Sequence, residues 1–173
     1  NFDWNEAVVT TITDASFGNE EVVIDTPHGP QKEKYKCQQG VVICLGPANI
    51  ANASEAIVHP LIWSSTVVRR QCRATLIAEA MAMLKGTELG AKIRATIVDM
   101  RGKLDMKKWE ETASANMGHC WMTDCDSLYE HLVSPKLNTI ENKRLAIDLL
   151  GMRQLIWERD GERTQYVDHS SGD

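Results

Sequence analysis

Three acidic residues have neighbours that set them apart from the other acids of the chain. Asp14 closes a run of β-branched residues, Asp124 closes an apolar run in WMTDCDS, and Glu79 lies among apolar residues in LIAEAMAM. Burying an unpaired carboxylate is costly, and clustered carboxylates repel one another unless a cation lies between them. A hard divalent cation prefers carboxylate oxygens. The pattern therefore predicts a divalent metal site, with three unrelated surface acids as the alternative.

The elements that would carry these acids follow from the local sequence. β-Branched and apolar runs predict strands over 7–13, 35–45, 55–64, 119–123 and 164–167, with a proline- and glycine-containing loop over 26–34. Helical periodicity predicts helices over 70–100, 126–132 and 140–158, the second with Asp126 as its N-cap. This order of elements predicts an α/β fold with a mixed sheet covered by helices.

The arrangement of the strands can also be predicted. The first three strands are expected to form an antiparallel meander. The strand that ends before Asp124 is expected to lie parallel to the strand that ends at Asp14, since the long helix over 70–100 can supply the crossover.

Each of the three acids lies in a segment with a recognisable motif. The segments are ITDASFGNE around Asp14, RRQCRATLIAEAMAMLKG around Glu79 and WMTDCDSLYEHL around Asp124. In this order and spacing they resemble the three leading motifs of the RNase H-like superfamily. KCQQGVVICL, IWSS and ENKRLAIDLLGMRQLIWE are further similar to the ribonuclease H domain of copia-type LTR retrotransposon polyproteins. The resemblance covers residues 7–167.

This resemblance implies both a fold and an activity. The fold would be RNase H-like, with a mixed five-stranded sheet in a single domain over residues 1–173 and a tail over 1–6. The activity would be endonucleolytic hydrolysis of the RNA strand of RNA–DNA hybrids. Asp14 and Asp124 would end adjacent strands, with the Glu79 carboxylate facing them from the helix. The three acids would hold two Mg²⁺ ions, or Mn²⁺ in their place. The implied partner is the reverse transcriptase domain of the same polyprotein, in an intracellular retroelement particle.

The C-terminal part departs from the family pattern. The family uses a fourth acid near the end of the domain, and this chain ends in YVDHSSGD. Asp173 is the expected fourth catalytic acid and Asp168 is the other choice, although neither lies in the family's motif. As a further alternative, the fourth acid lies beyond residue 173, and the domain lacks its C-terminal end. His169 is either the flexible-loop histidine of the family or a surface residue.

The composition of the chain limits its possible functions and leaves a second, non-catalytic function open. The net charge of -5 argues against autonomous nucleic-acid binding, and no apolar run of about 18 residues predicts a membrane span. The five cysteines lack Cys-x-x-Cys zinc spacing. The negative charge and the missing fourth motif favour a degenerate or domesticated RNase H-like domain that acts as a non-catalytic module. Three retained, mutually repelling acids favour the nuclease.

Overall fold

The computed structural model describes residues 3–69, 72–135, 140, 142–159 and 166–168. The strands are β1 (Val8–Thr26), β2 (Gly29–Gly46), β3 (His59–Val67), β4 (His119–Thr123) and β5 (Tyr166–Asp168). The α-helices are α1 (Thr75–Met100), α2 (Trp109–Asn116), α3 (Asp126–Val133) and α4 (Lys143–Gln154). Two 3-10 turns, η1 (Ile50–Asn52) and η2 (Met106–Lys108), and a π-helical turn, η3 (Leu155–Arg159), complete the described elements.

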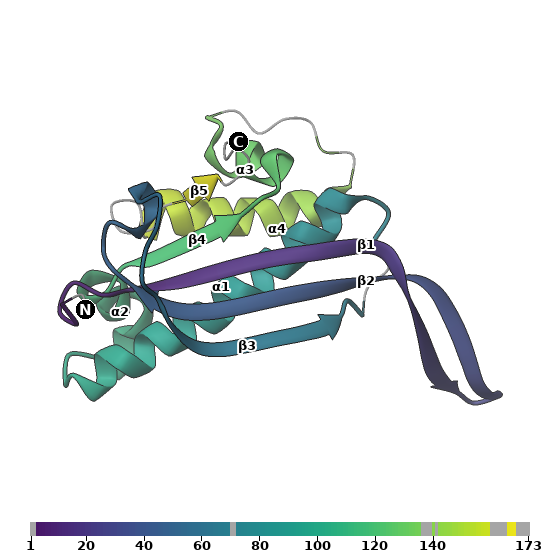
Figure 1. Cartoon of the computed structure of the whole chain (residues 1–173), viewed down its shortest axis with the longest axis horizontal. Helices are drawn as coiled ribbons and strands as arrows, with labels where there is room; N and C mark the ends of the chain where they lie inside the picture. The colour runs from purple at the N-terminus through teal and green to yellow at the C-terminus, as the bar shows by residue number, and fades with distance from the viewer. Residues whose placement is uncertain (1–2, 70–71, 136–139, 141, 160–165, 169–173) are drawn as a thin grey trace.

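The five strands form one mixed sheet in the order β3-β2-β1-β4-β5. β2 pairs antiparallel with both β1 and β3, while β4 pairs parallel with β1 and β5 pairs parallel with β4. The predicted antiparallel meander and parallel return are therefore confirmed. α1 supplies the crossover from β3 to β4 and lies with α4 on the same side of the sheet (Figure 1). None of the described helices has the length and apolar character needed to cross a bilayer.

β1 and β2 continue beyond the sheet as a two-stranded ribbon (Figure 1). The sequence predicted a strand that ended at Asp14 and a loop over 26–34, and both predictions are wrong. β1 runs through Asp14 to a turn at Pro27–His28, and the chain then enters β2. Gly29 accommodates the reversal with a φ of 101°. Pro30 is tolerated because no third strand in the described chain pairs with this part of the ribbon.

Residues 101–118, which connect the predicted helix over 70–100 to the predicted strand over 119–123, contain η2 and α2. One smaller prediction needs correction. Asp126 was expected to be the N-cap of α3, whereas Cys125 takes that position and Asp126 is the first helical residue. A negative charge in the first turn still stabilises the helix, because it faces the positive end of the helix dipole.

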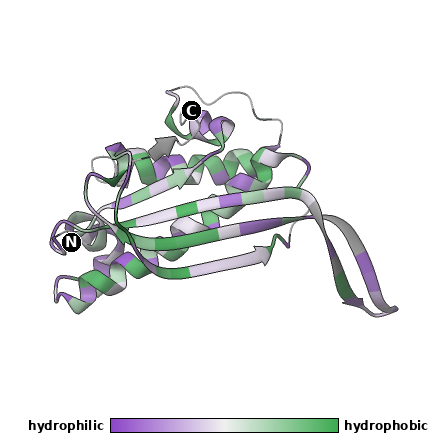
Figure 2. Cartoon of the chain, in the orientation of Figure 1, coloured by the Kyte–Doolittle hydropathy of each residue, from purple (hydrophilic) through white to green (hydrophobic). Residues whose placement is uncertain are grey.

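α1 approaches the sheet closely because two of its glycines face β1 and β4. A Cβ atom on Gly86 would lie 2.7 Å from Thr11 Cγ2, and one on Gly90 would lie 2.6 Å from Thr11 Oγ1 and would also meet the ring of His119. α1 carries hydrophobic and hydrophilic residues along its length (Figure 2), as expected of a helix with one face on a sheet. The two glycines therefore set the distance between α1 and the strands.

His119 is a buried polar residue beneath α1. Its Nε2 atom lies 2.8 Å from Thr11 Oγ1, and its side chain is 1% exposed. Burial lowers the pKa of His119 to about 3, and the positive charge of Arg94 acts in the same direction. His119 is therefore neutral in the folded protein at physiological pH.

This buried histidine predicts acid sensitivity. The unfolded chain binds the His119 proton below its usual pKa of 6.5, whereas the folded protein binds it only near 3. The contribution of His119 to stability should consequently fall as pH drops from 6.5 toward 3. His119→Gln should flatten this part of the curve of unfolding free energy against pH, measured by urea denaturation. His28→Gln is the matched control, since His28 is exposed in the ribbon turn. Equal slopes for wild type and His119→Gln would contradict the prediction.

Candidate active site

Three carboxylates meet where β1, α1 and β4 come together. One oxygen from each of Asp14, Glu79 and Asp124 lies within 4.8 Å of the others. Asp14 and Asp124 are exposed and Glu79 is buried. The structure thus brings together the three acids that the sequence analysis selected, although Asp14 lies within a continuous strand and not at its end.

The strand register explains why the two aspartates are neighbours. Ile12 of β1 pairs with Met122 of the parallel strand β4. Asp14 and Asp124 each follow this pair by two residues. Successive side chains alternate between the faces of a sheet, so a step of two residues keeps the same face. β4 ends at Thr123, whose side chain accepts a hydrogen bond of 3.2 Å from the backbone N–H of Cys125 and so holds the turn that carries Asp124.

Glu79 reaches the cluster from the N-terminal part of α1. Its Oε1 atom accepts a hydrogen bond of 3.2 Å from the backbone N–H of Ala15, while its buried Oε2 atom has no hydrogen-bond partner. Burial raises the pKa of Glu79 to about 7; the N–H of Ala15 opposes the rise, and the charges of Asp14 and Asp124 add to it. Sequence reasoning missed the role of Ala15, because a backbone donor leaves no side-chain signal.

The cluster fits a hard divalent cation. Such an ion would offer a partner to the orphaned Oε2 atom of Glu79 and would offset the repulsion between the three carboxylates. A donor set made only of carboxylate oxygens suits Mg²⁺ or Mn²⁺ better than a metal that prefers thiolate or imidazole. The described residues around the cluster therefore match the chemistry that the sequence predicted.

Of the two candidates for the fourth acid, only Asp168 lies within the described residues. Asp173, the predicted fourth catalytic acid, and His169 lie outside the described residues. Asp168 is the last residue of β5, and its backbone pairs with Thr123, immediately before Asp124. The end of β5 is therefore adjacent to the strand end that delivers one of the three acids.

Comparison with known proteins gives a fold and no sequence family. No family model matches the chain, and no curated protein matches its sequence. Among solved structures, LC11-RNase H1, isolated from compost by a metagenomic approach, is similar with a TM-score of 0.50 and 13% identity, over 93% of this chain and 83% of that chain.

Two further solved structures are similar over much of their length. LC11-RNase H1 in complex with an RNA/DNA hybrid gives a TM-score of 0.48 and 12% identity over 92% of this chain and 83% of that chain. The N-terminal RNase H domain of Rv2228c from Mycobacterium tuberculosis, fused to maltose-binding protein, gives a TM-score of 0.43 and 11% identity. This match covers 94% of this chain and 85% of that chain. At 13% identity, the similarity to the compost-derived LC11-RNase H1 is one of fold. The element order, the sheet topology and the compost-derived neighbour together show that this chain has an RNase H-like fold.

Proposed function

We propose that this chain is an endonuclease that hydrolyses the RNA strand of RNA–DNA hybrids with the help of divalent cations. The observation that carries the proposal is the convergence of Asp14, Glu79 and Asp124 within 4.8 Å. The resemblance of the three segments around these acids to RNase H motifs and the RNase H-like fold agree with it. A structural domain has little reason to keep three mutually repelling carboxylates together.

The exposed acids and the buried acid would have different parts in holding the cation. Asp14 and Asp124 are exposed, so a phosphodiester of a duplex can reach them from solvent, while Glu79 is buried and lies on the protein side of the site. Mg²⁺ bound by these residues would supply an activated nucleophile and would stabilise the leaving oxygen during phosphodiester hydrolysis. Ala15 holds Glu79 in position through its backbone N–H. Asp173 is proposed as the fourth catalytic acid, on the motif resemblance alone.

The substrate and the biological setting are also proposals. An RNA–DNA hybrid would be recognised by the shape of its minor groove and by its 2′-hydroxyl groups. The chain has a net charge of -5, so it offers few phosphate contacts of its own. The proposed partner is the reverse transcriptase domain of a copia-type polyprotein, within an intracellular retroelement particle. This domain would supply the remaining contacts to the phosphates of the hybrid. The isolated chain is therefore expected to cleave slowly.

Hybrid cleavage is the direct test. Wild-type protein with Mg²⁺ or Mn²⁺ should nick the labelled RNA strand of a hybrid, leave a DNA duplex intact and release 5′-phosphate and 3′-hydroxyl ends. Asp124→Asn should abolish cleavage, because it removes a charged ligand while keeping the size of the side chain. Asp126→Asn is the matched control: Asp126 is exposed two residues farther along, outside the cluster, and its replacement should leave cleavage unchanged.

The alternative outcomes are distinct. Equal cleavage by wild type and Asp124→Asn would show that a contaminating nuclease is responsible. Absence of cleavage by wild type, with Mn²⁺ present and with a reverse transcriptase domain added, would contradict the nuclease proposal. That result would favour a non-catalytic RNase H-like module.

A further inference from the structure

β3 is the edge strand of the sheet and has one free side. The strand order β3-β2-β1-β4-β5 gives β3 a partner in β2, and no described strand pairs with its other side (Figure 1). Such an edge offers unpaired backbone N–H and C=O groups to an extended chain. β3 is also exposed along its length, with only Ser64 and Val67 half-buried. The edge is therefore accessible to a further strand.

The register between β2 and β3 identifies the backbone groups on this free side. The backbone N–H of Val68, directly after β3, donates a hydrogen bond of 2.7 Å to the carbonyl oxygen of Cys37 in β2. The backbone groups of successive residues point to opposite sides of a strand, so every second residue before Val68 also faces β2. The residues between them, Trp63, Ser65 and Val67, consequently direct their N–H and C=O groups to the free side.

β3 lacks the charges that commonly protect an edge strand. Its sequence, HPLIWSSTV, contains no lysine, arginine, aspartate or glutamate, although these four types make up 25% of the chain. Natural proteins often place lysines or other charges on an edge strand to prevent pairing. Lys85 of α1 donates a hydrogen bond of 2.7 Å to Thr66 Oγ1, but it does so on the face of the sheet toward α1. Two copies of β3 can therefore meet without like charges between their outward groups.

Trp63 adds an apolar side chain beside the free edge. It is 75% exposed. Trp63 pairs with Val42 of β2, and Val42 pairs with Ile12 of β1, so these three side chains form a row on one face of the sheet. Thr11, the neighbour of Ile12, faces Gly86 of α1, so the row lies on the face opposite α1. A strand added to β3 would extend this row and cover part of the exposed indole.

We propose that two copies of this chain associate through β3, as antiparallel strands related by a two-fold axis at Ser65. In this register Ser65 lies opposite Ser65 of the second copy, and Trp63 lies opposite Val67 of the second copy. The outward N–H and C=O groups of all three residues then pair, in the pattern of an antiparallel ladder. Trp63 meets a β-branched side chain, which is a favourable cross-strand pair. A second copy fits because a two-fold interface requires a self-complementary strand, and β3 is one.

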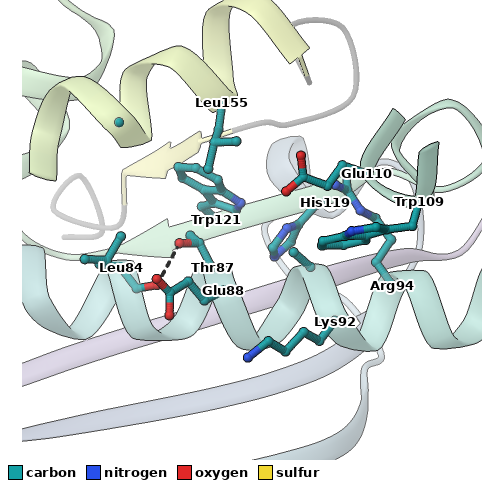
Figure 3. A pocket seen from close by; sticks show the side chains of 12 residues that line it. Leu84, Thr87, Glu88, Lys92, Arg94, Trp109, Glu110, His119, Trp121 and Leu155 are labelled. Carbon is teal, nitrogen blue, oxygen red and sulfur yellow. Dashed lines mark hydrogen bonds between the residues drawn. The ribbon is translucent and has the colours of Figure 1, made fainter. Parts of the chain in front are cut away.

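This dimer leaves the acid cluster open and goes beyond the nuclease proposal without depending on it. Asp14 pairs with Gly40, and Gly40 pairs with Ser65, so Asp14 and the two-fold axis lie in one row across the sheet. Five strand spacings of about 4.8 Å would separate the two copies of Asp14 by roughly 24 Å, on the same face of a continuous sheet. The cavity of about 540 Å³ between α1, α2 and β4, whose wall includes Trp121, has no lining residue from β3 (Figure 3). Association therefore covers neither the acids nor the cavity.

Sedimentation velocity of the wild-type protein measures this association. One strand pair gives an interface at the small end of the range for protein complexes, so the dimer should form as the concentration rises from about 10 µM to about 1 mM. At the higher concentration, the backbone amide hydrogens of Trp63, Ser65 and Val67 should exchange with solvent several-fold more slowly. A protein that is still monomeric at about 1 mM would overturn the proposal.

A charge at residue 65 tests the register. Ser65→Lys and Ser65→Glu each place like charges opposite one another across the axis, so each variant alone should be monomeric. An equimolar mixture of the two should associate again, because opposite charges then meet. Ser65→Thr is the matched control: it keeps the hydroxyl group and should keep the dimer. Ser65 is exposed, so all three variants should unfold in urea near the wild-type midpoint. A dimer that persists in Ser65→Lys, or a mixture that stays monomeric, would overturn the proposal.

Discussion

Replacement of Gly90 by alanine is expected to destabilise the protein by about 2 kcal/mol, whereas Gly151→Ala should stabilise it by about 0.5–1 kcal/mol. Both glycines lie in helices, so both replacements gain helix propensity. A Cβ on Gly90 would lie 2.6 Å from Thr11 Oγ1 and would overlap the ring of His119, which cannot move within the core. A Cβ on Gly151 meets no atom within 4 Å.

Urea denaturation of the two variants tests whether their free energies of unfolding change in opposite directions. The midpoints should move in opposite directions from that of wild type, with unchanged m-values. Gly90 lies about three turns from Glu79 on α1, so a displaced helix should also weaken hybrid cleavage. Stabilisation by both replacements would mean that α1 does not approach β1 and β4 as closely as described.

Glu79→Gln is expected to stabilise the cation-free protein by about 3 kcal/mol at pH 8 and to abolish cleavage. The pKa of Glu79 is about 7 in the folded protein, against 4.5 when it is unperturbed. The folded state therefore holds the proton more tightly, and the contribution of Glu79 to stability falls as pH rises from 4.5 to 7. Glutamine resembles the protonated acid, so the gain should vanish near pH 4. Its amide oxygen can still accept from the N–H of Ala15.

Denaturation in EDTA from pH 4 to pH 8 measures this gain. Adding Mg²⁺ at pH 8 should stabilise wild type and should have little effect on Glu79→Gln. Glu88→Gln is the matched control, because Glu88 is exposed on the same helix and outside the acid cluster. If Glu79→Gln is no more stable than wild type at pH 8 without cations, burial of the ionised Glu79 carboxylate does not destabilise the folded protein, and the prediction is wrong.

Local sequence was sufficient for the elements that carry the acids. The prediction for β4 matches its bounds, His119–Thr123, because a short apolar run lies between Gly118 and Asp124. The end of α1 at Met100 was also predicted, since helical periodicity stops there. The cluster could be anticipated because an acid among apolar residues, such as Glu79, is unusual in a helix.

Other features depend on partners that are distant in the sequence. Prolines and glycines near the turn indicate a loop when they are considered locally, yet Pro30 pairs with Asp25 in the ribbon. The fit of Gly90 against Thr11 and His119 exists only after α1 crosses the sheet. The unpaired N–H of Trp121 likewise depends on what surrounds the indole after folding. None of these can be derived from a window of neighbouring residues.

The order of the strands has a consequence for how the chain folds. β1 and β2 are joined by a two-residue turn, so their pairing loses little chain entropy. The pairing of β1 with β4 instead closes a loop that contains β2, β3, α1 and α2, and such non-local contacts form slowly. A partly folded chain with only its hairpin presents Asp14 without its two companions. The cation site thus forms only after α1 and β4 have joined the hairpin, and a bound cation would report that the loop between β1 and β4 has closed.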